Sequence, residues 1–209
     1  MTDQDIVARF RERAEAASTT VVEVESTEEA LEYSITVCRD KEACQTLASG
    51  CDLPLSGRAA DLCSLNEPQK LIAAPDLESS HLERLRELCA EQNFALISGG
   101  LRARLGGIDL GLTWAEAGIA ATGTLVQHCP GEDVRLAGMI SEVHIALLPV
   151  SAIVEESHAL ASRLGERMRA GVDSTAFITG PSRTADIERV LTLGVHGPLQ
   201  VHALLLRDQ

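Results

Sequence analysis

The sequence predicts an α/β protein with a mostly parallel β-sheet flanked by helices, and three observations support this class. Apolar residues make up 45% of the 209 residues, which is enough for a packed core. Aromatic residues make up only 2%, so the core must consist of Leu, Ile, Val and Ala, a mixture typical of parallel strands covered by helices. Strand-like and helix-like segments also alternate, with short connections between them.

The N-terminal part is predicted to be mainly helical. Apolar residues at helical spacing indicate an amphipathic helix over 5–17, and a β-branched segment at 19–24 indicates a strand. Ser26 and Glu29 have the spacing of a capping box, so a second helix is expected to begin there. The residues that follow mix Gly and Pro with short apolar pieces, which suggests short helices and a buried turn. We therefore expect residues 1–69 to form a helical extension or cap.

A clearer pattern begins at residue 70. It indicates a strand at 71–74, a helix at 77–92 and an apolar strand at 94–98. A strand, helix and strand with short connections form a βαβ unit, whose two strands are parallel. Residues 70–209 are accordingly predicted to form the α/β domain.

Two short apolar segments, 117–121 and 124–128, flank Thr122-Gly123 and predict a β-hairpin. The other predicted elements are a strand over 143–149, a helix over 153–169, and strands over 174–179 and 199–206.

The charge and the apolar pattern restrict the partners. Eighteen basic and 31 acidic residues give a net charge of -13, which repels nucleic acid and anionic lipid. No uncharged apolar segment approaches the roughly 20 residues of a membrane helix. The first 17 residues carry charges throughout and lack the apolar region of a signal peptide. A soluble cytoplasmic protein without membrane insertion is expected.

The six cysteines do not have the spacing of a metal site, because no C-x-x-C is present. Reduced thiols are expected, with Cys38, Cys44 and Cys51 as a weak three-ligand candidate. The glycines form neither G-x-G-x-x-G nor a P-loop, and the histidines lack ligand spacing. No metal and no other cofactor are therefore predicted on this chain.

The glycine-containing turn that follows the strand at 174–179 is a candidate anion site. Backbone N–H groups, two hydroxyls and a guanidinium can hold a carboxylate or a phosphate. The alternative is a tight turn in which Arg183 pairs with Asp186 or Glu188. The hairpin turn offers a second glycine between two hydroxyls, and its alternative is hairpin formation alone. The predicted binding residues are Thr122, Gly123, Thr124, Gly180, Ser182, Arg183 and Thr184.

Two residues are candidates for proton transfer. Glu116 precedes the hairpin, and His196 lies between two glycines in a loop from which it can reach a ligand. A loop histidine that binds a backbone carbonyl is an equally common arrangement. His144 lies within an apolar strand, so a buried, hydrogen-bonded role is expected for it.

These segments resemble the signature of the LUD-domain family, particularly its lactate-utilisation protein C type. The resemblance covers roughly 70–206 and rests on Trp114 to Val126, Val143-His144-Ile145, Gly180 to Glu188 and Gly194 to Pro198. The sequence departs from the family pattern at Ala121, where an acidic residue is usual, and at Ser141-Glu142.

The resemblance implies a fold related to the ribose-phosphate isomerase, glucosamine-phosphate deaminase and CoA-transferase group. It also implies a role in oxidising L-lactate to pyruvate, as a cluster-free subunit whose partner subunits carry iron–sulfur clusters. Such an accessory subunit would bind a small carboxylate or phosphate anion. The alternatives are a free-standing enzyme of the isomerase or acyl-transferase type, with Glu116 as its base, and a metabolite-sensing binding module.

Overall fold

The structure is a computed structural model that describes residues 2–41, 69–104, 107–170, 174–184, 192–193 and 197–207. Its main feature is a six-stranded sheet in which every neighbouring pair of strands is parallel. This sheet confirms the predicted α/β class. The strands follow the order β1 (Thr19–Val24), β12 (Gln200–Leu206), β7 (Ser141–Pro149), β4 (Ile108–Trp114), β2 (Leu71–Ala73) and β3 (Ala95–Ile97).

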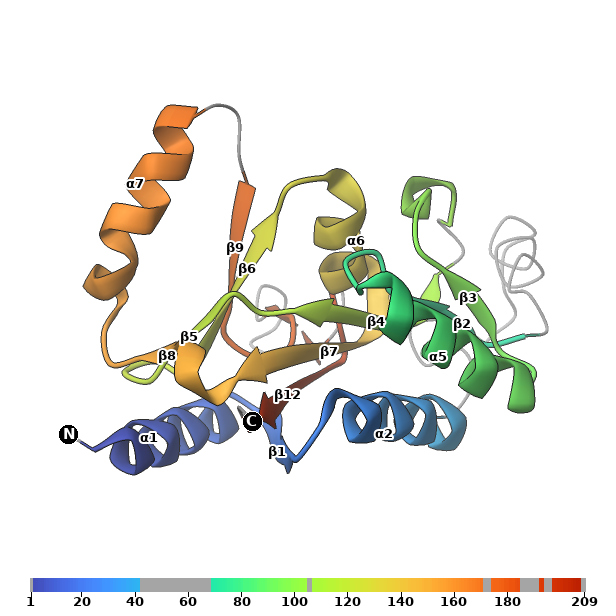
Figure 1. Ribbon diagram of the computed structural model, residues 1–209, viewed down its shortest axis with the longest axis horizontal. Helices are drawn as coiled ribbons and strands as arrows, with labels where there is room; N and C mark the ends of the chain where they lie inside the picture. Colours follow the sequence, from blue (N-terminus) through green and yellow to red (C-terminus); the bar gives the residue numbers. More distant parts are fainter. Residues whose placement is uncertain are drawn as a thin grey trace.

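Helices flank this sheet on both faces (Figure 1). The described α-helices are α1 (Asp3–Ala16), α2 (Thr27–Asp40), α5 (Ser79–Glu91), α6 (Glu132–Ile140) and α7 (Ala161–Ala170). Successive residues of β7, Leu147 and Leu148, lie in different buried clusters, because side chains alternate across a strand. Leu147 shares its cluster with residues of α2 and α5, whereas Leu148 packs with Phe10 of α1. The core is mainly aliphatic on both faces, as the composition predicts.

A smaller four-stranded sheet adjoins the face that α1 covers. It contains β8 (Ile153–Val154), β5 (Ala117–Ile119), β6 (Thr124–Cys129) and β9 (Ser174–Ile178), in that order. β5 and β6 form the predicted antiparallel hairpin, and β9 also pairs antiparallel with β6. The sequence predicted a single, mostly parallel sheet, whereas these strands form a separate, mostly antiparallel one. A separate two-stranded pair contains β10 (Arg183–Thr184) and β11 (Thr192–Leu193).

Several predicted bounds differ from the structure. The helix predicted over 153–169 is instead β8, then η3 (Ser157–Leu160), a 3₁₀ turn, and finally α7. β4 and α6 were not predicted at all. Two further 3₁₀ turns are η1 (Leu101–Ala103) and η2 (Val150–Ala152).

The start of α2 follows the prediction in part. Ser26 is the N-cap and accepts a hydrogen bond from the Glu29 amide, but Glu29 accepts from the Glu25 amide rather than from Ser26. β1 pairs with β12, so the described part of residues 1–69 contributes a strand to the main sheet. The predicted boundary at residue 69 stays a prediction, because residues 42–68 lie outside the described part.

Candidate functional site

Glu116 lies in the short connection between β4 and β5, where its amide donates to the Val126 carbonyl at 2.8 Å. Its carboxylate is held by two arginines of α7. Oε1 accepts from Arg163 Nη1 at 2.9 Å and from Arg167 Nη2 at 2.5 Å, and Oε2 contacts Arg167 Nη1. The side chain of Glu116 is only 16% exposed.

These contacts determine the charge of Glu116. Burial alone would raise the pKa of this carboxyl, but hydrogen bonds from Arg167 and Arg163 outweigh that effect and hold the pKa below its usual value. Glu116 is therefore an ionised partner of two guanidinium groups at neutral pH. A general base needs its carboxylate oxygens directed at a substrate, whereas these oxygens bind arginine.

The hairpin turn and the end of β9 lie next to each other. The hydroxyl of Thr124 lies 2.7 Å from that of Thr122 and 2.8 Å from that of Thr179, which forms a chain of three hydroxyls. β5 and β9 end at the same edge because both pair antiparallel with β6, which lies between them. The two turns thus lie together because β6 joins their strands.

The end of α1 covers this edge. Gly123 has φ +65°, and a Cβ there would lie 2.2 Å from the backbone nitrogen of Ala14. Gly180 has φ +83°, and a Cβ there would lie 2.1 Å from the carbonyl oxygen of Ala17. Both turns need glycine because a helix approaches them closely.

Arg183 also contacts the end of α1. Its Nη2 donates to the Ala17 carbonyl at 2.8 Å and contacts the Ser18 hydroxyl, while the side chain stays exposed. A guanidinium at the C-terminus of a helix satisfies a free carbonyl and complements the helix dipole. Ser182 donates its amide to Pro198 at 3.0 Å. The Thr184 side chain, His196, Asp186 and Glu188 lie outside the described residues.

Two buried histidines lie on neighbouring strands. His144 is fully buried and its Nε2 lies 2.8 Å from the hydroxyl of Thr113, which confirms the buried, hydrogen-bonded role expected from the sequence. His202, which was not singled out from the sequence, lies with Nδ1 2.9 Å from the Tyr33 hydroxyl. Burial lowers the pKa of each imidazole to about 4. Both are therefore neutral near pH 7.

A buried ion cluster at the amino ends of β4 and β7 was missed. Lys41, whose side chain is 3% exposed, places Nζ 2.8 Å from Asp109 and 2.5 Å from Glu142. Lys70 donates to three carbonyls at the end of α2. Because Lys41 and Glu142 are far apart in sequence, only the fold brings them together. The departure from the family pattern at Glu142 was the one available signal.

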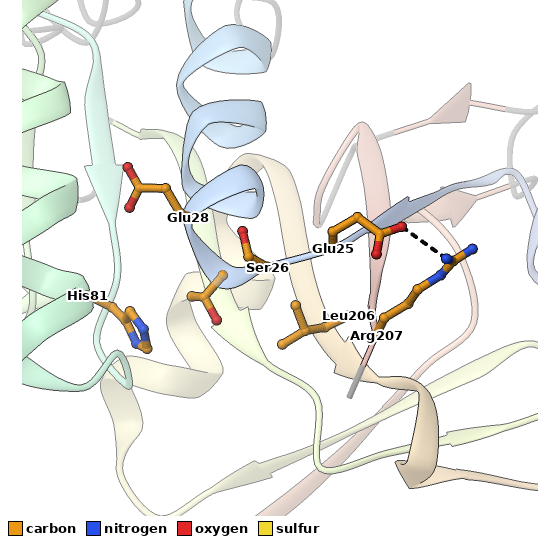
Figure 2. Close-up of a pocket in the computed structure, with 7 residues that line it drawn as sticks. Glu25, Ser26, Glu28, His81, Leu206 and Arg207 are labelled. Atoms are coloured by element: carbon orange, nitrogen blue, oxygen red, sulfur yellow. Dashed lines mark ion pairs between the residues drawn. The ribbon is translucent and has the colours of Figure 1, made fainter. Parts of the chain in front are cut away.

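A cavity of about 490 Å³ lies at the carboxyl ends of β1 and β12 (Figure 2). Ligands of α/β proteins often bind at this edge. Glu25 and Glu28 line the cavity together with His81, and the Arg207 guanidinium pairs with Glu25 at 3.1 Å. Since the cationic group is already paired and carboxylates line the wall, the cavity does not suit an anion.

Within the described residues, no group of three or more His, Cys, Asp and Glu side chains is placed to hold a metal ion. Cys38 is buried in the main core, and burial raises the pKa of its thiol to about 12. Cys44 and Cys51, its partners in the weak metal-site candidate, lie outside the described part. No helix in the described ranges is long and apolar enough to cross a membrane.

The LUD-domain family model matches residues 7–206. The chain belongs to the LUD-domain family. This LUD-domain protein is 38% identical to lactate utilization protein C of Exiguobacterium sp. over 103 residues, which are 48% of this chain and 45% of that relative. It is 27% identical to the uncharacterized protein YkgG of Escherichia coli over 177 residues, which cover 79% of this chain and 77% of that protein.

A crystal structure of a DUF162 family protein from Deinococcus radiodurans has the same fold. It matches with a TM-score of 0.57 and 15% identity, and the match covers 99% of both chains. The matches to the first lactate-utilisation relatives span less than half of their length, 45% and 44% in two cases.

Proposed function

We propose that this LUD-domain protein takes part in lactate utilisation, as the cluster-free component of an iron–sulfur system that oxidises L-lactate to pyruvate. The similarity to relatives named lactate utilization protein C supports the role. The single structural observation that carries it is the signature residue Glu116, held by Arg163 and Arg167. Arginines are the side chains best suited to bind the carboxylate of a small organic acid.

Partner subunits supply the redox chemistry in this proposal, and this chain binds the acid. The signature segments offer two places with arginine. One is the edge formed by Thr122–Thr124 and Gly180–Thr184, where Arg183 is exposed but already donates to α1. The other is the cluster at Glu116, where the arginines bind a carboxylate. The second place is the stronger candidate, because its arginines already bind a carboxylate, that of Glu116.

A gene deletion in the source organism tests the role. Without the gene, growth on L-lactate as the carbon source should fail, while growth on glucose should be normal. The wild-type gene should restore growth on lactate, and the tagged protein purified anaerobically should carry iron-containing partners with it. Normal growth of the deletion strain on lactate would refute the proposal.

The competing function is a free-standing isomerase or acyl-transferase, in which Glu116 would act as base or nucleophile. The ion pairs of Glu116 weigh against this function, because they direct both carboxylate oxygens at arginine. Turnover of a sugar phosphate or a CoA thioester by the purified chain alone would favour it.

A further inference from the structure

The cluster at Glu116 joins one carboxylate to two guanidinium groups. Oε1 accepts from both arginines, and Arg167 binds both oxygens of the carboxylate. The side chains of Arg163 and Arg167 are 50% and 26% exposed, whereas that of Glu116 is 16% exposed. The cationic groups are thus more open to solvent than the anion they hold.

The helix that supplies both arginines, α7, packs only weakly against the rest of the protein. None of the residues of α7 is buried, and its apolar contact with the small sheet is made by the half-buried Leu164. Figure 1 shows α7 beside the small sheet, at the opposite end of the molecule from α5. Half-exposed ion pairs each contribute only about 0.2–1 kcal/mol. Another carboxylate can therefore exchange with Glu116 without disturbing the core.

The local charge favours an anion from solution. α7 carries three arginines and Glu166, a net charge of +2 in a chain whose net charge is -13. A concentration of positive charge on an otherwise acidic molecule attracts small anions to this place. The attraction does not extend to nucleic acid, since the remaining surface repels polyanions.

The arginines lie beside a small apolar cluster. Glu116 directly precedes Ala117, which pairs with Val126 in the hairpin, and both belong to a small buried cluster that Leu164 contacts. A carboxylate bound to the arginines would therefore lie near Leu164, the partly exposed aliphatic residue of α7 that packs against this cluster. This combination fits a short acid with a methyl-sized tail better than a long or doubly charged one.

We propose that Arg163 and Arg167 are the recognition site for the carboxylate of a short 2-hydroxy or 2-oxo acid. Glu116 occupies this site when the acid is absent, and it competes with the acid for the two guanidinium groups. This inference rests on the proposed function, because it names the site at which the lactate-handling protein holds its acid.

Titration of L-lactate and pyruvate into the purified chain tests the site, with calorimetry or arginine Nε–H NMR shifts as readout. Glu116→Gln removes the competing charge and should bind each acid about tenfold or more tightly than wild type does. Adding Arg167→Gln or Arg163→Gln to that variant should weaken binding roughly 10- to 150-fold, which is the value of one charge-assisted hydrogen bond.

Glu132→Gln is the matched control. Glu132 forms a comparable two-bond ion pair with Arg102, at 2.6 and 2.5 Å, but Arg102 lies in η1 rather than on α7. This variant should bind both acids as wild type does. A thermal melt of each variant shows that the fold is intact before binding is compared.

The direction of the change in acid affinity caused by Glu116→Gln distinguishes a binding site from a cluster that only holds α7 in place. If the cluster only fastens α7, Glu116→Gln and Arg167→Gln will lower the melting temperature and leave acid binding unchanged. That result, or failure of Glu116→Gln to bind either acid, would overturn the inference. The growth test is independent of it, since a deletion strain that cannot use lactate supports the proposed function even if the acid binds elsewhere.

Discussion

Replacing Gly123 by Ala is expected to destabilise the protein strongly, because α1 leaves no room for a side chain there. The Cβ would lie 2.2 Å from Ala14 N, 2.4 Å from Arg13 C and 2.5 Å from Ala14 Cα. All three atoms are backbone, so no flexible side chain can move aside. Either the hairpin turn or α1 must shift.

Gly100 provides a matched control. It has φ +71°, close to the +65° of Gly123, but a Cβ there meets nothing within 4 Å. Gly100→Ala should therefore cost only the left-handed backbone strain, about 1–2 kcal/mol. Gly123→Ala adds an overpacking cost of about 1–3 kcal/mol, for a total of about 2–5 kcal/mol.

Thermal unfolding followed by circular dichroism measures the difference. For a chain of this length, 1 kcal/mol corresponds to about 2–4 °C. Gly100→Ala should lower Tm by about 2–8 °C, and Gly123→Ala by about 4–20 °C. Equal effects of the two substitutions would refute the reasoning. They would mean that the hairpin turn is open, as a ligand-binding turn would be, and is not covered by α1.

Three further predictions follow from buried or capping groups. Arg183→Gln should lower Tm by about 1–4 °C through loss of the contact at the α1 terminus, with acid affinity unchanged by titration. Lys41→Met should cost about 3–5 kcal/mol in urea unfolding, because it strands two carboxylates, and a loss below 1 kcal/mol would contradict this. Stability should rise from about pH 4 to 6.5, because neutral His144 and His202 take up protons on unfolding in that range. Asp76, with its pKa raised to about 6 by burial, opposes this by releasing a proton, and His202→Gln should flatten the profile in urea unfolding across pH.

The elements that could be predicted are those with a strong local pattern. The apolar segments of β1, β7 and β12 indicate strands, and Ser26 indicates the start of a helix. Thr122-Gly123 indicates a turn. By contrast, the division into two sheets depends on pairing β6 with β9 across about 50 residues of sequence, which periodicity does not encode.

The candidate site shows a similar limit. A glycine in a turn can allow another group to approach the backbone closely, but the sequence does not show whether that group is a ligand or a helix. At Gly123 and Gly180 the approaching group is α1. Arg163 and Arg167 could not be recognised from the sequence as partners of Glu116. Their spacing predicts a helix, but it does not predict that this helix lies beside the hairpin.

The most direct test of the lactate-utilisation role is the rate of L-lactate-dependent dye reduction in anaerobic extracts of the deletion strain. The account predicts little reduction in that extract, restoration when the purified chain is added, and none with the purified chain alone. Undiminished lactate oxidation in the extract that lacks the chain would contradict it.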